Sequence, residues 1–402
     1  MNSFDVLAFR KHFPALVDGA AHFDGPGGSQ TPDVVGDAVA RTLTSPLANR
    51  GGVTTAERNA EEAVRECRRA LADLTGGESG GVVFGRSMTA LTFDLSRALA
   101  KQWAAGDEVV VTRLDHDANI RPWVIAAEGA GAVVKWADFD PATGELDPAA
   151  VGALLTERTR LVAVTAASNL LGTMPDVRAV ADRAHEVGAL AYVDGVHYTA
   201  HVPVDVAELG ADFFACSPYK FLGPHCGALV AAPELLESLH PDKLLPSSEA
   251  VPERFELGTL PYELMAGTTA AIDLLASAVP SEGSRRERLQ ASMRAIHAHE
   301  DALRRDVEDA VAVLPGAAVH SRARRRTPTL LVTLDGVDMG EAHRFLGERG
   351  VNAPAGSFYA IEASRHLGLG DAGGLRIGLA PYTTEDDVDR LLDGLREFAA
   401  SR

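Results

Sequence analysis

The chain has 402 residues, of which 46% are hydrophobic and 23% are charged, so it is long enough for two domains of unequal size and too apolar to be disordered. Its formal net charge of -18 would repel nucleic acid phosphates and anionic lipids, so we expect neither as a partner. The three cysteines, the lack of a signal-peptide pattern and the lack of a membrane-length apolar run favour a cytoplasmic location.

Short apolar runs alternate with amphipathic segments between about residue 80 and residue 230. This alternation is typical of a mainly parallel sheet that is covered by helices. Apolar residues recur at helical spacing in 88–103 and 177–188, which predicts two of the covering helices. We expect seven buried strands, at residues 81–84, 107–112, 132–137, 160–166, 189–195, 212–217 and 227–232. The fold class is therefore α/β.

The pattern changes after about residue 280. A highly charged helical stretch at 284–311 is followed by an apolar strand pattern at 327–334, a segment at 340–350, a second strand pattern at 375–380 and a last helix. We predict a large domain at 16–280 and a smaller α+β domain at 281–402, with residues 1–15 joining them.

Polar residues follow several of the predicted strands. In open α/β sheets, ligands bind beyond the carboxyl ends of the strands, where such residues converge. His116, Asn169 and Asp194 each follow an apolar run, and another run leads into Ser217, Tyr219 and Lys220. We expect these side chains to meet in one site.

Lys220 is the lysine that follows a predicted buried strand and precedes a glycine-containing turn. Burial lowers the pKa of an amine and makes it a nucleophile toward an aldehyde, although a lysine at a strand end can also reach solvent. Asp194 either pairs with a buried cation, such as a protonated pyridine nitrogen, or starts a turn. Both interpretations stay open on spacing alone.

Ser87 and Thr89 lie where a strand passes into a helix. The free N–H groups at a helix start suit a phosphate, while N-capping by Ser87 is an equally compatible interpretation. The glycine pattern at 368–373 precedes a strand instead of following one, so we interpret it as a turn and not as a nicotinamide-cofactor site. The histidines at 116, 197, 201 and 225 match no metal-ligand spacing, so we expect no metal.

Nine fragments in order resemble the class V aminotransferase family of fold-type I enzymes that use pyridoxal 5'-phosphate (PLP), in its cysteine desulfurase-like branch. They span nearly the whole chain: AHFDGPGGSQTP, ANRGG, FGRSMTAL, LDHDANIRPW, SNLLGT, YVDGVHYTAHVPVDV, DFFACSPYKFLGP, RFELGT and LRIGLAPYTT. The resemblance implies a homodimer that acts on a small amino acid. It also implies that Lys220 forms the Schiff base, that Asp194 pairs with the pyridine nitrogen, and that His116 stacks on the ring.

The resemblance implies roles for further residues. Arg376 would bind the substrate carboxylate, for which a bidentate guanidinium is well suited. The remaining implied contacts go to the cofactor: Ser87, Met88, Thr89, Ser217 and Tyr219 to the phosphate, Asn169 and His197 to the phenolic oxygen, and Gly258 and Thr259 to the phosphate in the neighbouring subunit.

The chain departs from the desulfurase pattern in three places. His197 stands where desulfurases usually have glutamine, and Tyr219 stands where they usually have histidine. The stretch at 353–374, which corresponds to their mobile cysteine loop, contains no cysteine. The leading hypothesis is therefore a lyase or transferase of desulfurase-like chemistry without a persulfide cysteine. An aminotransferase, an amino-acid epimerase of the isopenicillin N epimerase type, and a non-catalytic protein of the PLP fold are the alternatives.

Overall fold

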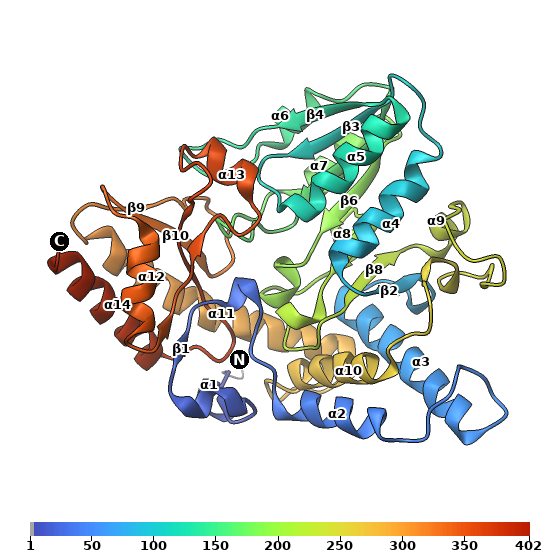
Figure 1. The fold of residues 1–402 in the computed structure, drawn as a ribbon, viewed down its shortest axis with the longest axis horizontal. Helices are drawn as coiled ribbons and strands as arrows, with labels where there is room; N and C mark the ends of the chain where they lie inside the picture. The colour runs from blue at the N-terminus through green and yellow to red at the C-terminus, as the bar shows by residue number, and fades with distance from the viewer. Residues whose placement is uncertain (1–3) are drawn as a thin grey trace.

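The computed structural model describes residues 4–402, which form two lobes around two separate sheets (Figure 1). The larger sheet has the strand order β2-β8-β7-β6-β5-β3-β4. β8 is antiparallel to both of its neighbours, and the other pairings recorded in this sheet are parallel. Its strands are β2 (Val82–Gly85), β3 (Glu108–Thr112), β4 (Val133–Ala137), β5 (Thr159–Thr165), β6 (Leu190–Asp194), β7 (Phe213–Cys216) and β8 (Gly227–Ala231). The seven predicted strands and the mainly parallel sheet are confirmed.

One feature of the prediction is wrong, because β4 is not a buried strand. It lies at the edge of the sheet and pairs with β3 alone, and Val133 is 50% exposed. Its Trp136 is partly covered by the guanidinium of Arg113, 4.9 Å from the ring centroid. An apolar run in the sequence does not show whether a strand has one neighbour or two.

Helices cover both faces of the large sheet. Successive side chains of a strand point to opposite faces, so a strand that is apolar throughout needs a cover on each face. Val109 and Val110 are consecutive in β3 and pack into two different hydrophobic clusters. α4 (Met88–Ala100) and α5 (Arg121–Ala130) cover one face. The other face is covered by α3 (Thr55–Thr75), α7 (Val177–Glu186) and α10 (Tyr262–Ala276). Both helices predicted for this region are therefore confirmed, as α4 and α7.

The smaller lobe is built on an antiparallel sheet in the order β12-β13-β10-β9. Two short strands, one from each end of the chain, also pair in parallel. The elements of this lobe are β1 (Ala21–His22), β9 (Ala317–Val319), β10 (Thr329–Leu334), α12 (Met339–Gly347), β11 (Val351–Asn352), β12 (Ala355–Gly356), α13 (Ile361–His366), β13 (Gly374–Gly378) and α14 (Glu385–Ala400). The predicted second α+β region is therefore present.

The long helix α11 (Arg285–Ala312) links the two lobes and crosses the lower part of Figure 1. Leu289 and Met293 of α11 pack in the large-lobe core, and Leu303 and Val307 pack in the small-lobe core. The domain boundary at residue 280 stays a prediction. The remaining helices are α1 (Val6–Arg10), α2 (Asp33–Leu43), α6 (Pro148–Gly152), α8 (Val206–Leu209) and α9 (Pro233–Glu237). Within residues 4–402, no helix is both long and apolar enough to cross a membrane.

Candidate active site

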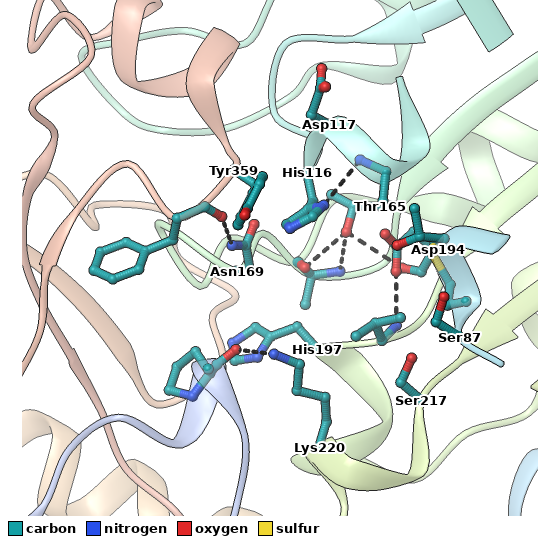
Figure 2. A pocket seen from close by; sticks show the side chains of 18 of the residues that line it. Ser87, His116, Asp117, Thr165, Asn169, Asp194, His197, Ser217, Lys220 and Tyr359 are labelled. Atoms are coloured by element: carbon teal, nitrogen blue, oxygen red, sulfur yellow. Dashed lines mark hydrogen bonds between the residues drawn. The ribbon is translucent and has the colours of Figure 1, made fainter. Parts of the chain in front are cut away.

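A cavity of about 580 Å³ lies beyond the carboxyl ends of the parallel strands, where small-lobe residues also reach it (Figure 2). This is the position at which α/β sheets bind ligands, and the volume suits a small organic molecule. Most of the predicted site residues line it: Ser87, Met88, Thr89, His116, Asn169, Asp194, His197, Ser217, Tyr219, Lys220 and Arg376. The sheet therefore brings together side chains that are up to about 290 positions apart in the sequence, as the strand-end argument expects.

Lys220 ends a short turn directly after β7, and its amine points into the cavity (Figure 2). Nζ donates a hydrogen bond of 2.5 Å to the carbonyl oxygen of Pro26 and lies 4.7 Å from the ring centroid of Tyr219. Burial, with a smaller contribution from the positive charge of Arg376, lowers the pKa of Lys220 to about 7. A large fraction of this amine is therefore unprotonated, and nucleophilic, near neutral pH.

Asp194 is the last residue of β6 and is 4% exposed. Its Oδ1 accepts a hydrogen bond of 2.9 Å from the backbone N–H of Val196. Burial raises the pKa of Asp194 to about 6, against the opposing effects of that hydrogen bond and of Lys220. The carboxylate is therefore mainly ionised at neutral pH and can form an ion pair with a cation in the cavity.

His116 follows β3 and faces the cavity (Figure 2). Its Nδ1 accepts a hydrogen bond of 3.0 Å from the backbone N–H of Ala118, which leaves the proton of the neutral ring on Nε2. Burial and the charge of Lys220 lower the pKa of His116 to about 4. The imidazole is thus a neutral, planar group at physiological pH.

The start of α4 forms one wall of the cavity. Ser87 is the N-cap, and its Oγ accepts a hydrogen bond of 3.1 Å from the N–H of Ala90. Gly227 of β8 packs closely against this loop, since an added Cβ would lie 2.3 Å from the carbonyl carbon of Ser87 and 2.4 Å from the nitrogen of Met88. Ser87 therefore caps α4, as one of the two interpretations predicted. Capping still leaves the first N–H groups of the helix free to bind an anion.

His197 and Arg376 line the cavity, and each has a buried nitrogen atom without a hydrogen-bond partner. His197 is 3% exposed, and its Nε2 lies 2.9 Å and 3.0 Å from the hydroxyls of Thr327 and Thr329. Arg376 is 2% exposed, and its Nη1 donates to the carbonyl oxygen of Asn169 at 3.1 Å. Nδ1 of His197 and Nε of Arg376 are buried without a hydrogen-bond partner in the protein. Buried polar atoms are nearly always satisfied, so a polar ligand bound beside these two residues would complete their hydrogen bonding.

The comparison with known families agrees with this geometry. The model of the aminotransferase class-V family matches residues 21–391. The chain belongs to this family. Class-V aminotransferases are PLP-dependent enzymes, so the chain is a PLP-dependent enzyme, and the predicted family is confirmed.

Individual class-V relatives span nearly the whole chain. An uncharacterised protein of Mycobacterium tuberculosis is 34% identical over 396 residues, which covers 98% of this chain and 99% of the relative. The cysteine desulfurase CsdA of Escherichia coli is 29% identical over 415 residues, and the match covers 98% of each chain. The crystal structure of CsdA has a TM-score of 0.87 at 27% identity and covers 100% of this chain and 99% of that one. The fold and the desulfurase-like branch are therefore confirmed.

Phe358 and Tyr359 are among the residues that line the cavity and were not predicted from the sequence. Phe358 and Tyr359 lie in the turn between β12 and α13, and both have a positive φ, of 53° and 59°. The ring of Phe358 lies 3.6 Å from Cζ of Arg376. A Phe-Tyr pair without glycine gives no turn signal in the sequence, and nothing in its pattern shows that it faces the site.

Gly258 and Thr259 are the two predicted residues that do not line the cavity. Gly258 is exposed and has a φ of +83°. The prediction places them against a neighbouring subunit of a class-V dimer, which a single chain does not test. The glycine pattern at 368–373 lies in a turn before β13, as predicted.

Proposed function

We propose that the chain binds PLP in this cavity through a covalent bond to Lys220 and cleaves the carbon–sulfur bond of a cysteine-type amino acid, without a persulfide on the protein. The observation that carries the proposal is the amine of Lys220, with a pKa of about 7, placed with the buried carboxylate of Asp194 in one cavity. Structural ion pairs at a protein surface do not combine these features.

The residues present fit the chemical groups of PLP. The N–H groups at the start of α4, with Ser217 and Tyr219 nearby, suit the phosphate. Asp194 suits the protonated pyridine nitrogen, and the neutral ring of His116 suits the pyridine face. Nδ1 of His197 has no hydrogen-bond partner in the protein, so it suits a hydrogen bond with the phenolic oxygen. Asn169 is the second predicted contact of that oxygen.

The same residues suit an amino-acid substrate. Arg376 lines the cavity and its Nε has no hydrogen-bond partner in the protein, and a guanidinium binds a carboxylate through two parallel hydrogen bonds. PLP, when bound, supplies an electron sink for the charge that develops at the substrate Cα. Lys220, with a pKa near 7, is suited to take up the Cα proton as the sulfur leaves Cβ.

The positions of the cysteines support cleavage without a protein persulfide. Cys67, Cys216 and Cys226 are buried, and none of these three residues lines the cavity. Burial raises the pKa of the Cys226 thiol to about 11 and raises the pKa values of Cys67 and Cys216 further. Because the thiolate is the nucleophile, none of them is suited to attack sulfur at neutral pH. We therefore propose β-elimination, in which cysteine and water give pyruvate, ammonia and hydrogen sulfide.

We also propose a cytoplasmic homodimer. The family resemblance places Gly258 and Thr259 against the phosphate of the neighbouring subunit, and their exposure in the single chain is compatible with such a contact.

A product assay tests the proposed reaction. Holoenzyme incubated with L-cysteine should release sulfide and pyruvate in equal amounts, and the Lys220→Ala variant should release neither. Alanine together with a persulfide on a protein cysteine would contradict the proposal in favour of desulfuration. A keto acid with aminated cofactor would indicate an aminotransferase, and D-cysteine formed from the L-isomer would indicate an epimerase.

A further inference from the structure

The turn at Phe358 and Tyr359 holds an unfavourable backbone conformation at the edge of the cavity. Both residues have left-handed φ values, 53° and 59°, which bulky side chains seldom adopt. The large lobe fixes both carbonyl groups of the turn. Phe358 O accepts a hydrogen bond of 2.9 Å from Nδ2 of Asn169, and Tyr359 O accepts one of 2.8 Å from the N–H of Asp117. The surroundings therefore determine the conformation of this turn, a situation that is common at functional sites.

Phe358, Asn169 and Arg376 contact one another in a closed triangle. Nδ2 of Asn169 donates to Phe358 O, and the guanidinium of Arg376 lies 3.6 Å above the ring of Phe358. Nη1 of Arg376 in turn donates to the carbonyl oxygen of Asn169 at 3.1 Å. Figure 2 draws the hydrogen bond of Asn169 as a dashed line at this edge of the cavity. The plane of the guanidinium is thus set by one aromatic face and one carbonyl group.

The electrostatic surroundings of Arg376 make the aromatic face important. Burial lowers the pKa of Arg376 to about 9, and Asp24 and, to a smaller extent, Tyr219 counteract this effect. Within residues 4–402, Asp24 makes no ion pair with Arg376, and its Oδ1 lies 3.3 Å from Nδ1 of His22. A desolvated guanidinium without a carboxylate partner gains most from a π face, because the attraction of the ring strengthens when water is excluded.

We infer that Phe358 is a positioning residue, whose ring holds the guanidinium of Arg376 in the orientation that receives the α-carboxylate of the substrate. The inference rests on the proposed function, in which Arg376 binds that carboxylate. Asn169 contributes by tying the Phe358 carbonyl to the large lobe, and one of its two amide hydrogens makes that bond.

A pair of probes that differ only in the carboxylate tests this role. The holoenzyme is titrated with L-alanine and with ethylamine, following the visible absorption of the bound cofactor. The midpoint for L-alanine should rise about tenfold in Phe358→Leu and in Phe358→Met, because the guanidinium loses its aromatic support. The midpoint for ethylamine should not change, since this probe has no carboxylate. Phe358→Tyr keeps the π face and should restore the wild-type midpoint for L-alanine.

The chain offers a matched control far from the cavity. The guanidinium of Arg349 lies 3.5 Å from the ring centroid of Phe345 in the small lobe, so Phe345→Leu removes a similar contact and should leave both midpoints unchanged. The inference is overturned if the L-alanine midpoint is unchanged in a folded Phe358→Leu or Phe358→Met variant, or if both midpoints rise together. A wild-type protein that binds PLP but does not distinguish the two probes also overturns it. A protein that binds no PLP overturns the proposed function as well.

Discussion

Lys220 and Asp194 show how burial and pairing compete at one site. Burial lowers the pKa of Lys220 to about 7 and raises that of Asp194 to about 6, while the attraction between the two charges opposes both shifts. Burial has the larger effect on each residue. Near pH 7 the pair therefore combines a partly unprotonated amine with a mainly ionised carboxylate. The first state is required to react with an aldehyde, and the second is required to hold a pyridinium nitrogen.

The pKa of Lys220 predicts the pH dependence of cofactor capture. The unprotonated amine is the reactive form, so the rate at which apoprotein takes up PLP should rise with pH through about 7 and level off above it. An ordinary lysine would keep the rate rising to about pH 10. Rapid-mixing absorption measurements from about pH 5 to about pH 10 provide the test, with Lys220→Ala as the unreactive control. A rate that still rises steeply at about pH 9 would contradict the lowered pKa.

At the scale of elements, the start of α4 is shaped by the strand beside it. Gly227 opens β8, and its missing side chain lets the loop at Ser87 and Met88 approach within contact distance. That loop presents the free N–H groups of α4 to the cavity, together with Thr89. The proposed phosphate site therefore depends on close packing between β8 and α4, and not only on the residues that line it.

A single methyl group at Gly227 tests this dependence. Gly227→Ala places a Cβ 2.3 Å from the carbonyl carbon of Ser87, so the loop must move and PLP affinity should fall about tenfold or more. The affinity is measured by titrating apoprotein with PLP. Gly36→Ala is the matched control, because Gly36 is exposed in α2 and an added Cβ there meets nothing within 4 Å. If the Gly227→Ala variant and the wild type bind PLP with equal affinity, the proposal that the phosphate binds at the start of α4 is contradicted.

At the scale of the whole molecule, the cavity is complete only when both lobes are in place. The large lobe supplies Lys220 and Asp194, and the small lobe supplies Arg376 and the turn at Phe358. The helix α11 packs into both hydrophobic cores, and Thr327 and Thr329 of the small lobe contact His197 of the large lobe. Contacts between the lobes therefore orient groups on both sides of the proposed cofactor.

The parts that sequence reasoning could predict are those with a periodic or positional signal. Seven strands and two of the covering helices, α4 and α7, were predictable because burial imposes a regular spacing of apolar residues. Lys220, Asp194 and His116 could be grouped because parallel strands end at one edge of a sheet. The exposure of β4 was missed because it depends on the order of strands in space. The turn at Phe358 was missed because two hydrogen bonds from the other lobe, and not a glycine, hold its backbone.

Reduction of the holoenzyme with borohydride tests the central claim most directly. The account predicts that the yellow colour is lost, that the protein mass rises by one reduced cofactor, and that the label lies on the peptide that contains Lys220. A protein that remains colourless in the presence of PLP, or a label on another lysine such as Lys243, would contradict the account.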